Sequence, residues 1–142
     1  MGMTTSAGNA GHYEQIDCYT GVAEADPHQL VKMLLDGALG KIAVAKGLVT
    51  RGETPTKGEV IGQAISIVGG LRSSLDLSKG GEIAANLDNL YEYIERRLLE
   101  ANLNNDLAIL DEVAALLREI KGAWESIPQE LRSKPELSAT AV

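Results

Sequence analysis

The hydrophobic positions of the chain recur with the 3.6-residue period of amphipathic helices in four separate segments. We predict helices over residues 27–50, 56–77, 82–103 and 107–125, joined by turns that are rich in glycine, proline or asparagine. No segment shows the alternating pattern that is typical of a β-strand. Four helices of similar length with short connections predict an all-α fold, an antiparallel four-helix bundle.

Local signals mark where these helices begin. Asp26 and Gln29 have the spacing of a capping box, and Pro27 lies where proline favours the first helical turn. The stretch Thr56-Lys57-Gly58-Glu59 forms a second capping box, which predicts the start of the second helix. The run Lys79-Gly80-Gly81 predicts a break before the third helix.

The segments outside the predicted bundle differ from it in composition. Residues 1–25 are mostly small and polar, and their apolar side chains are isolated, so we predict a flexible N-terminal arm. Residues 26–127 form the antiparallel helical bundle. For residues 128–142 we predict a short helical turn, a fifth helix opened by Pro128, followed by a disordered tail.

Composition narrows the classes of protein that fit this pattern. The chain has 142 residues, no Phe and a net charge of −7, so its core must be mostly aliphatic and no basic stripe is available for nucleic acid or anionic membranes. Cys18 is the only cysteine, which excludes an intrachain disulfide and fits a reducing compartment. The first residues lack the features of a secretory signal and no segment is apolar enough to span a membrane. We therefore expect a cytoplasmic protein.

Side chains that carry catalysis or bind cofactors lack the required spacing. His12 and His28 match neither a zinc-binding pair nor a di-iron helix motif, and no glycine-rich phosphate loop is present. We expect no catalytic, cofactor-binding or metal-binding residues. His28 lies near Lys32, which is compatible with a histidine phosphotransfer bundle, but its place directly after Pro27 favours a polar residue of the first helical turn.

Two helix faces are candidates for binding a partner. One face of the second helix is small and uncharged, which fits either a docking surface or a weakly constrained solvated face; it comprises Gly62, Gln63, Ser66, Gly69, Gly70, Ser73 and Ser74. The fourth helix carries an extra apolar row, Ile109, Leu116 and Ala123, which either widens the core or lines a groove for a partner helix. Trp124 is expected to anchor the core.

Four stretches, taken together in this order, resemble the flagellar secretion chaperone family FliS. They are Asp26 to Ala38, the Lys57-Gly58-Glu59 opening of the second helix, Lys79 to Leu87 followed by Leu90-Tyr91, and Arg96 to Asp106, with Trp124 closing the fourth helix. The resemblance covers about residues 10–127. It implies an antiparallel helical bundle without enzymatic activity.

The resemblance also implies a partner. It predicts that the chain binds the C-terminal segment of flagellin, prevents premature polymerisation and delivers this cargo to the export gate of the flagellar type III secretion apparatus. It assigns Tyr13 to cargo binding and docking at the gate. Our candidate cargo-binding residues are Tyr13, Ile61, Ile65, Val68, Gly69, Leu87, Tyr91, Ile109 and Leu116. The sequence leaves open a homodimer, and a self-associating structural bundle as an alternative to the chaperone.

Overall fold

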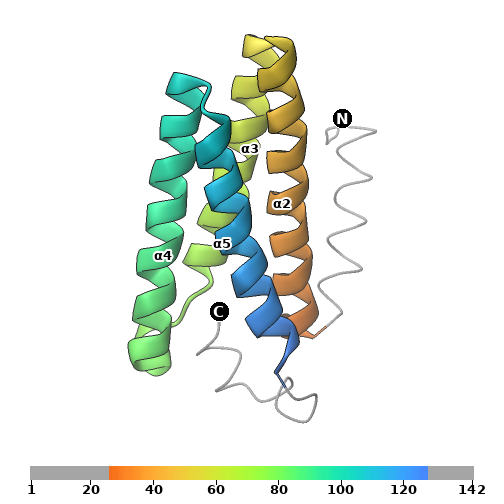
Figure 1. The fold of residues 1–142 in the computed structure, drawn as a ribbon. Helices are drawn as coiled ribbons and strands as arrows, with labels where there is room; N and C mark the ends of the chain where they lie inside the picture. The colour runs from red at the N-terminus through yellow and green to blue at the C-terminus, as the bar shows by residue number, and fades with distance from the viewer. Residues whose placement is uncertain (1–25, 128–142) are drawn as a thin grey trace, which may run out of the picture.

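The computed structural model describes residues 26–127 as four α-helices and no strand. The helices run alternately up and down (Figure 1), which confirms the predicted all-α antiparallel bundle. Their bounds are α2, Pro27–Arg51; α3, Thr54–Ser73; α4, Leu77–Asn104; and α5, Leu107–Glu125. Tyr13, Cys18, His12, the predicted arm and the predicted tail lie outside the described residues.

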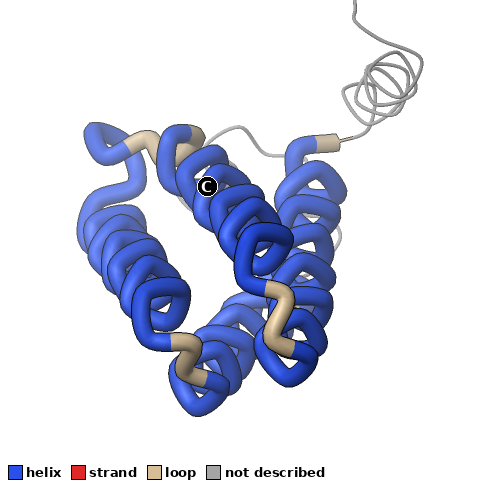
Figure 2. Tube along the Cα trace, turned by 90° about the horizontal axis from the view of Figure 1, so that it is seen from above, coloured by secondary structure: helices blue, strands red, loops and turns tan. Residues whose placement is uncertain are grey.

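The helices form a closed ring in which each packs against the next, and α5 returns to pack against α2. Figure 2 shows this arrangement from one end of the bundle. The centre of the ring is aliphatic apart from Tyr91 and Trp124; its largest fully buried side chains include Leu35, Ile42, Ile61, Leu71, Ile94, Leu98, Leu110 and Leu117. This agrees with a core built almost without aromatic residues.

Three helices begin with an aspartate cap. Asp26 accepts a hydrogen bond from the backbone N–H of Gln29 at 2.9 Å, as expected from the sequence. Asp76 and Asp106 cap α4 and α5 through the same kind of contact. Carboxylate caps also complement the partial positive charge at a helix N-terminus.

The start of α3 differs from our prediction. The helix begins at Thr54, with Pro55 in its first turn, and its N-cap residue Glu53 makes no side-chain capping bond. The second capping box was therefore wrong. Gly52 ends α2 in the left-handed conformation (φ 73°), so the chain turns sharply and Pro55, with its fixed φ, can open α3 two residues earlier than Thr56.

The junction between α3 and α4 also differs in detail. We expected α3 to reach residue 77, but it ends at Ser73, and Asp76 caps a new helical turn by accepting from Ser78 and Lys79. The predicted break at Lys79-Gly80-Gly81 is present within α4, where Gly81 has φ 56° and ψ −134°. That conformation strongly favours glycine.

Candidate functional site

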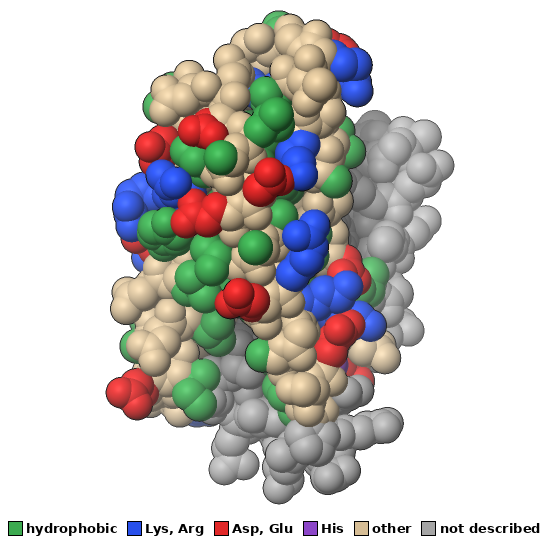
Figure 3. Space-filling model, in the orientation of Figure 1, with side chains coloured by type: hydrophobic (Ala, Val, Ile, Leu, Met, Phe, Trp, Pro, Cys, Tyr) green, Lys and Arg blue, Asp and Glu red, His purple; other side chains and the backbone are tan. Residues whose placement is uncertain are grey.

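An apolar groove opens between the first half of α4 and the second half of α5. It has a volume of about 390 Å³ and is lined by Ile83, Leu87, Leu90, Tyr91, Leu116, Glu119, Ile120, Ala123, Trp124 and Ile127. Figure 3 shows hydrophobic side chains gathered along the seam between these two helices. Nine of these ten residues are apolar or aromatic and one is charged, so the groove suits an apolar partner surface.

The groove exists because the apolar face of α4 is longer than the part of it that the bundle covers. Towards the C-terminal end of α4, Ile94 and Leu98 are fully buried. Towards its N-terminal end, Leu87 and Leu90 are half-buried and Ile83 is 58% exposed. An exposed apolar continuation of a core stripe is typical of a surface that binds a partner.

Two buried aromatic side chains close the base of the groove. Tyr91 on α4 lies in the core, and burial raises the pKa of its hydroxyl to about 12, so the phenol is uncharged at neutral pH. Trp124 on α5 is only 6% exposed. Glu119 is the single charged side chain in the groove lining.

Trp124 is held by His28, which lies in the first turn of α2. The indole Nε1 donates to the backbone carbonyl of His28 at 2.7 Å, and the imidazole Nε2 donates to the carbonyl of Trp124 at 2.8 Å. The two rings stack with centroids 4.9 Å apart. The first-turn position of His28 agrees with the sequence, but the residue is only 5% exposed and its Nε2 donates to a carbonyl, whereas phosphotransfer requires an exposed ring.

Polar contacts close the seam between α4 and α5 beyond the groove. The Tyr93 hydroxyl and the Arg97 guanidinium both donate to Glu112, the latter at 2.9 Å. These two bonds hold the pKa of Glu112 below its ordinary range, with the Tyr93 hydroxyl as the largest cause. The groove therefore lies beside a part of the seam that hydrogen bonds to Glu112 hold closed.

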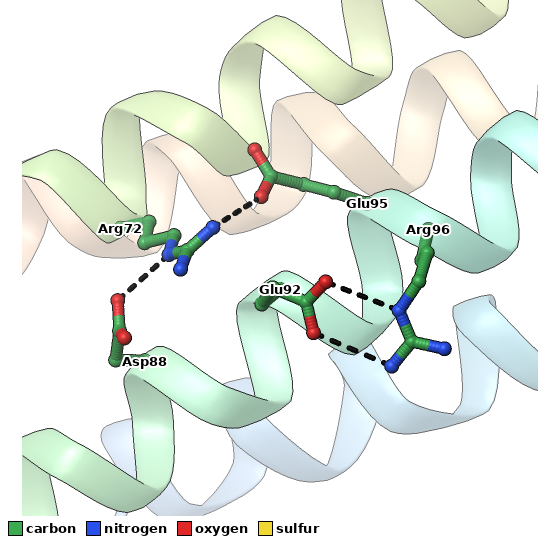
Figure 4. Close-up of polar contacts among 5 residues, drawn as sticks. All are labelled: Arg72, Asp88, Glu92, Glu95 and Arg96. Atoms are coloured by element: carbon green, nitrogen blue, oxygen red, sulfur yellow. Dashed lines mark hydrogen bonds and ion pairs between the residues drawn. The ribbon is translucent and has the colours of Figure 1, made fainter.

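Ion pairs hold α4 against α3 on the side away from α5. Arg72 of α3 donates to Asp88 at 2.7 Å and to Glu95 at 3.0 Å, and these two acceptors lie two turns apart on α4 (Figure 4). Arg96 pairs with Glu92 along α4 itself. Because Asp88 belongs to the groove half of α4, this half is fastened to α3 while its other side faces the groove.

The candidate cargo-binding residues separate into groups. Leu87, Tyr91 and Leu116 line the groove together. Ile65 and Gly69 are partly buried on α3, and a Cβ at Gly69 would lie 3.3 Å from a carboxylate oxygen of Glu95. The remaining described candidates, Ile61, Val68 and Ile109, are core residues of the bundle. Their part in cargo binding stays a prediction, as does that of Tyr13.

The two candidate faces have different surroundings. Most of the small uncharged face of α3 is exposed, and its role in docking or self-association stays a prediction. In the extra row of α5, Ile109 widens the core, whereas Leu116 and Ala123 line the groove. Core widening therefore holds for Ile109, and binding of a partner helix at the groove end of this row stays a prediction.

Several other groove residues lie on the inward faces of their helices. The 3.6-residue period puts Ile83, Leu90 and Ile120 on these faces, but the bundle leaves them partly uncovered. The available signal was the length of the apolar stripe on α4, which continues to the break at Gly81. His28 gave no such signal, because its partner Trp124 lies 96 residues away in the chain.

Comparison with known proteins identifies the family. A profile described as "Flagellar protein FliS" matches residues 9–131. The chain belongs to the FliS family of flagellar secretion chaperones. FliS proteins are chaperones rather than enzymes, in agreement with the missing catalytic spacing.

Individual FliS proteins are similar along most of their length. The flagellar secretion chaperone FliSB of Pseudomonas aeruginosa is 50% identical over 115 residues, which cover 81% of this chain and 91% of the relative. FliS of Salmonella typhimurium is 46% identical over 116 residues, 81% of this chain and 86% of the relative. FliS of Vibrio cholerae is 39% identical over 123 residues, 87% and 90% of the two chains.

Two further properties concern the described part of this FliS chain. Within residues 26–127, every helix is too short or too polar to cross a bilayer. Across the same residues, histidine and acidic side chains do not gather in a group of three or more that could hold a metal ion.

Proposed function

We propose that this FliS chaperone binds the C-terminal segment of flagellin, keeps it from polymerising early and delivers it to the flagellar export gate. The observation that carries the proposal is the apolar groove between α4 and α5, in a chain whose relatives are flagellar secretion chaperones. A segment held in this groove is unavailable for contacts between flagellin subunits. Its release at the gate would restore those contacts after export.

The groove is long enough to hold one face of a short amphipathic helix. Its α5 wall extends from Leu116 to Trp124, which at 1.5 Å per residue is about 12 Å, or roughly two helical turns. A cargo helix of that length can present apolar side chains at i, i+3 or i+4, and i+7 to a groove of this kind. Burial of these side chains would offset the entropy that a disordered segment loses when it folds on binding.

The charge at the groove edge favours a particular cargo. Glu119 is exposed and is the only acidic or basic residue of the lining. A lysine or arginine at the edge of the bound segment would pair with it, whereas an acidic side chain there would be repelled. We expect a bound helix with an apolar face and at least one flanking basic residue.

Calorimetric titration tests the binding itself. The full-length chain is titrated with a synthetic peptide of the flagellin C-terminal segment. We expect one-to-one binding with a large negative heat-capacity change, because folding and apolar burial accompany association. Absence of both heat and a complex on a sizing column would contradict the proposed function.

A matched pair of variants tests the place of binding. Ile83→Glu puts a charge into the groove, and Leu99→Glu puts the same charge on α4 outside it; the two side chains are 58% and 52% exposed. We expect Ile83→Glu to weaken peptide binding by about tenfold or more, because a carboxylate in an apolar contact is left unpaired. Leu99→Glu should bind like the wild type. Equal affinities of the two variants would place the cargo elsewhere.

A further inference from the structure

His28 and Trp124 form a reciprocal contact between the start of α2 and the end of α5. Each side chain donates to the backbone carbonyl of the other residue, at 2.7 and 2.8 Å, and the ring planes lie within 13° of parallel. His28 is 5% exposed and Trp124 is 6% exposed. A buried indole with its N–H bonded and one face stacked has a single orientation available.

The contact between His28 and Trp124 involves two of the groove-lining residues, Trp124 itself and Ile127. Trp124 is one of the residues that line the groove. The carbonyl of Trp124, which accepts from the imidazole Nε2, also accepts from the backbone N–H of Ile127 at 3.3 Å, and Ile127 is another lining residue. His28 is therefore bonded to the part of α5 that forms one end of the groove, although it does not line the groove itself.

Attachment of α5 to α2 does not depend on this contact alone. Lys32 pairs with Glu125 at 3.2 Å, and Lys121 pairs with Asp36 at 2.6 Å, so two ion pairs join the same helices near the same end. These four charged side chains lie outside the groove lining. The additional effect of His28 is to fix the orientation of the Trp124 indole.

We propose that His28 is a positioning residue for cargo binding: it holds the Trp124 indole as a fixed end wall and keeps the groove in its binding-competent shape. This inference rests on the proposed function of the groove. A preformed wall favours binding because the indole has no rotamer freedom left to lose when the cargo arrives. Without the imidazole, the Trp124 carbonyl loses its side-chain donor and the indole loses the ring stacked on it, so the indole can rotate into the space that the cargo would occupy.

Two substitutions separate the hydrogen bond from the bulk of the side chain. His28→Gln keeps an N–H donor at a position similar to the imidazole Nε2, and His28→Leu removes every donor while it retains an apolar side chain. Lys32→Gln serves as the control, since it breaks an ion pair between the same two helices. Circular dichroism confirms the helical content of each variant. If His28→Leu does not fold, His28→Asn replaces it, because its amide is too short to reach the Trp124 carbonyl.

The first measurement needs no cargo. Trp124 is the only tryptophan of the chain, so the fluorescence emission reports on the groove wall alone. We expect iodide quenching to increase at least about twofold in His28→Leu, as the buried indole becomes accessible, and to remain near the wild-type value in His28→Gln and Lys32→Gln. Equal quenching in wild type and His28→Leu would overturn the proposal.

The second measurement is the affinity for the flagellin C-terminal peptide, well below the unfolding temperature. We expect His28→Leu to bind about tenfold more weakly, and His28→Gln to recover to within about threefold of the wild type. A lower unfolding temperature with unchanged affinity would mean that His28 only stabilises the bundle, and would overturn its positioning role. If the wild type does not bind the peptide, the proposed function fails, whereas the quenching result still decides whether His28 fixes Trp124.

Discussion

The seam between α4 and α5 has a closed half and an open half, and both are made by the same two helices. In the closed half, the apolar faces meet completely, and the buried residues include Leu98, Ala101, Ile109, Leu110 and Val113. In the open half, Ile83 remains exposed, and Leu87, Leu116 and Ile120 are only half-buried. An apolar stripe therefore does not show by itself whether its partner belongs to the same chain.

Polar contacts explain why one half closes and the other does not. In the closed half, Glu112 accepts from Tyr93 and Arg97 across the seam, and Lys57 of α3 donates to the carbonyl of Asn102 and to Asn105 at the α4–α5 turn. In the open half, the ion pairs of Arg72 fasten α4 to α3 rather than to α5. Figure 4 shows this second set of contacts.

The largest expected effect compares two neighbouring leucines of α5, one in the covered core and one in the open groove. Leu117 is fully buried, and Leu116 lines the groove. We expect Leu117→Ala to lower the free energy of unfolding by about 2–5 kcal/mol, because it leaves a cavity. Leu116→Ala should lower it by about 1 kcal/mol, because much less area is lost, while weakening cargo binding. Urea denaturation followed by circular dichroism measures both, and similar losses would contradict the distinction.

The next largest effect concerns the hydrogen bonds of Lys57 at the closed end of the seam. Lys57 is 4% exposed, and its ammonium donates to Asn102 and Asn105 at 2.8 and 2.6 Å. Lys57→Met keeps most of the apolar stem but loses both bonds, so we expect the free energy of unfolding to fall by about 2 kcal/mol. The exposed Lys79, changed to Met, is the control and should alter it by about 0.5 kcal/mol or less. Urea unfolding at neutral pH compares them.

A smaller effect is the dependence of stability on pH that Glu112 contributes. The Tyr93 hydroxyl and the Arg97 guanidinium stabilise the charged form of Glu112, so its pKa in the folded protein lies below the ordinary value of 4.5. Such a group stabilises the fold above its unfolded-state pKa and loses that contribution as the pH falls through the folded-state pKa. We expect Glu112→Gln to be less stable than the wild type near neutral pH and the two to converge in acid. Thermal unfolding over a pH series measures this; a constant difference would argue against the titration.

The smallest expected effect sharpens the description of the open half. Glu119→Gln removes the only charge of the groove lining without a large change of shape. We expect affinity for the flagellin peptide to fall by about two- to fivefold at low salt, and the difference to shrink as salt is added, because an exposed ion pair is weak and screened. Calorimetry at two ionic strengths measures it. An unchanged affinity at low salt would mean that no basic side chain of the cargo lies near Glu119.

Periodicity predicted the four helices and most of the inward residues, but not how far each stripe is covered. Ile83 and Leu98 lie on one face of α4 and look equivalent in sequence, yet they are 58% and 0% exposed. Coverage depends on where α5 ends and how it tilts, which no local pattern records. The start of α3 was missed because two helix-start signals competed, and the one containing Pro55 prevailed. The contact of His28 with Trp124 forms only when the folded bundle brings the end of α5 beside the start of α2, so no local pattern predicts it.

The contact between His28 and Trp124 also bears on where another domain can be fused to the bundle. The start of α2 lies beside the end of α5 at one end of the bundle (Figure 1). Trp124 and Ile127, at this end, also line the groove. A fluorescent domain or affinity handle fused close to residue 26 or residue 127 would therefore crowd the groove. A circular permutant that opens the exposed turn at Gly52 and Glu53, and joins the original ends with a flexible linker, would move such a fusion to the opposite end of the bundle.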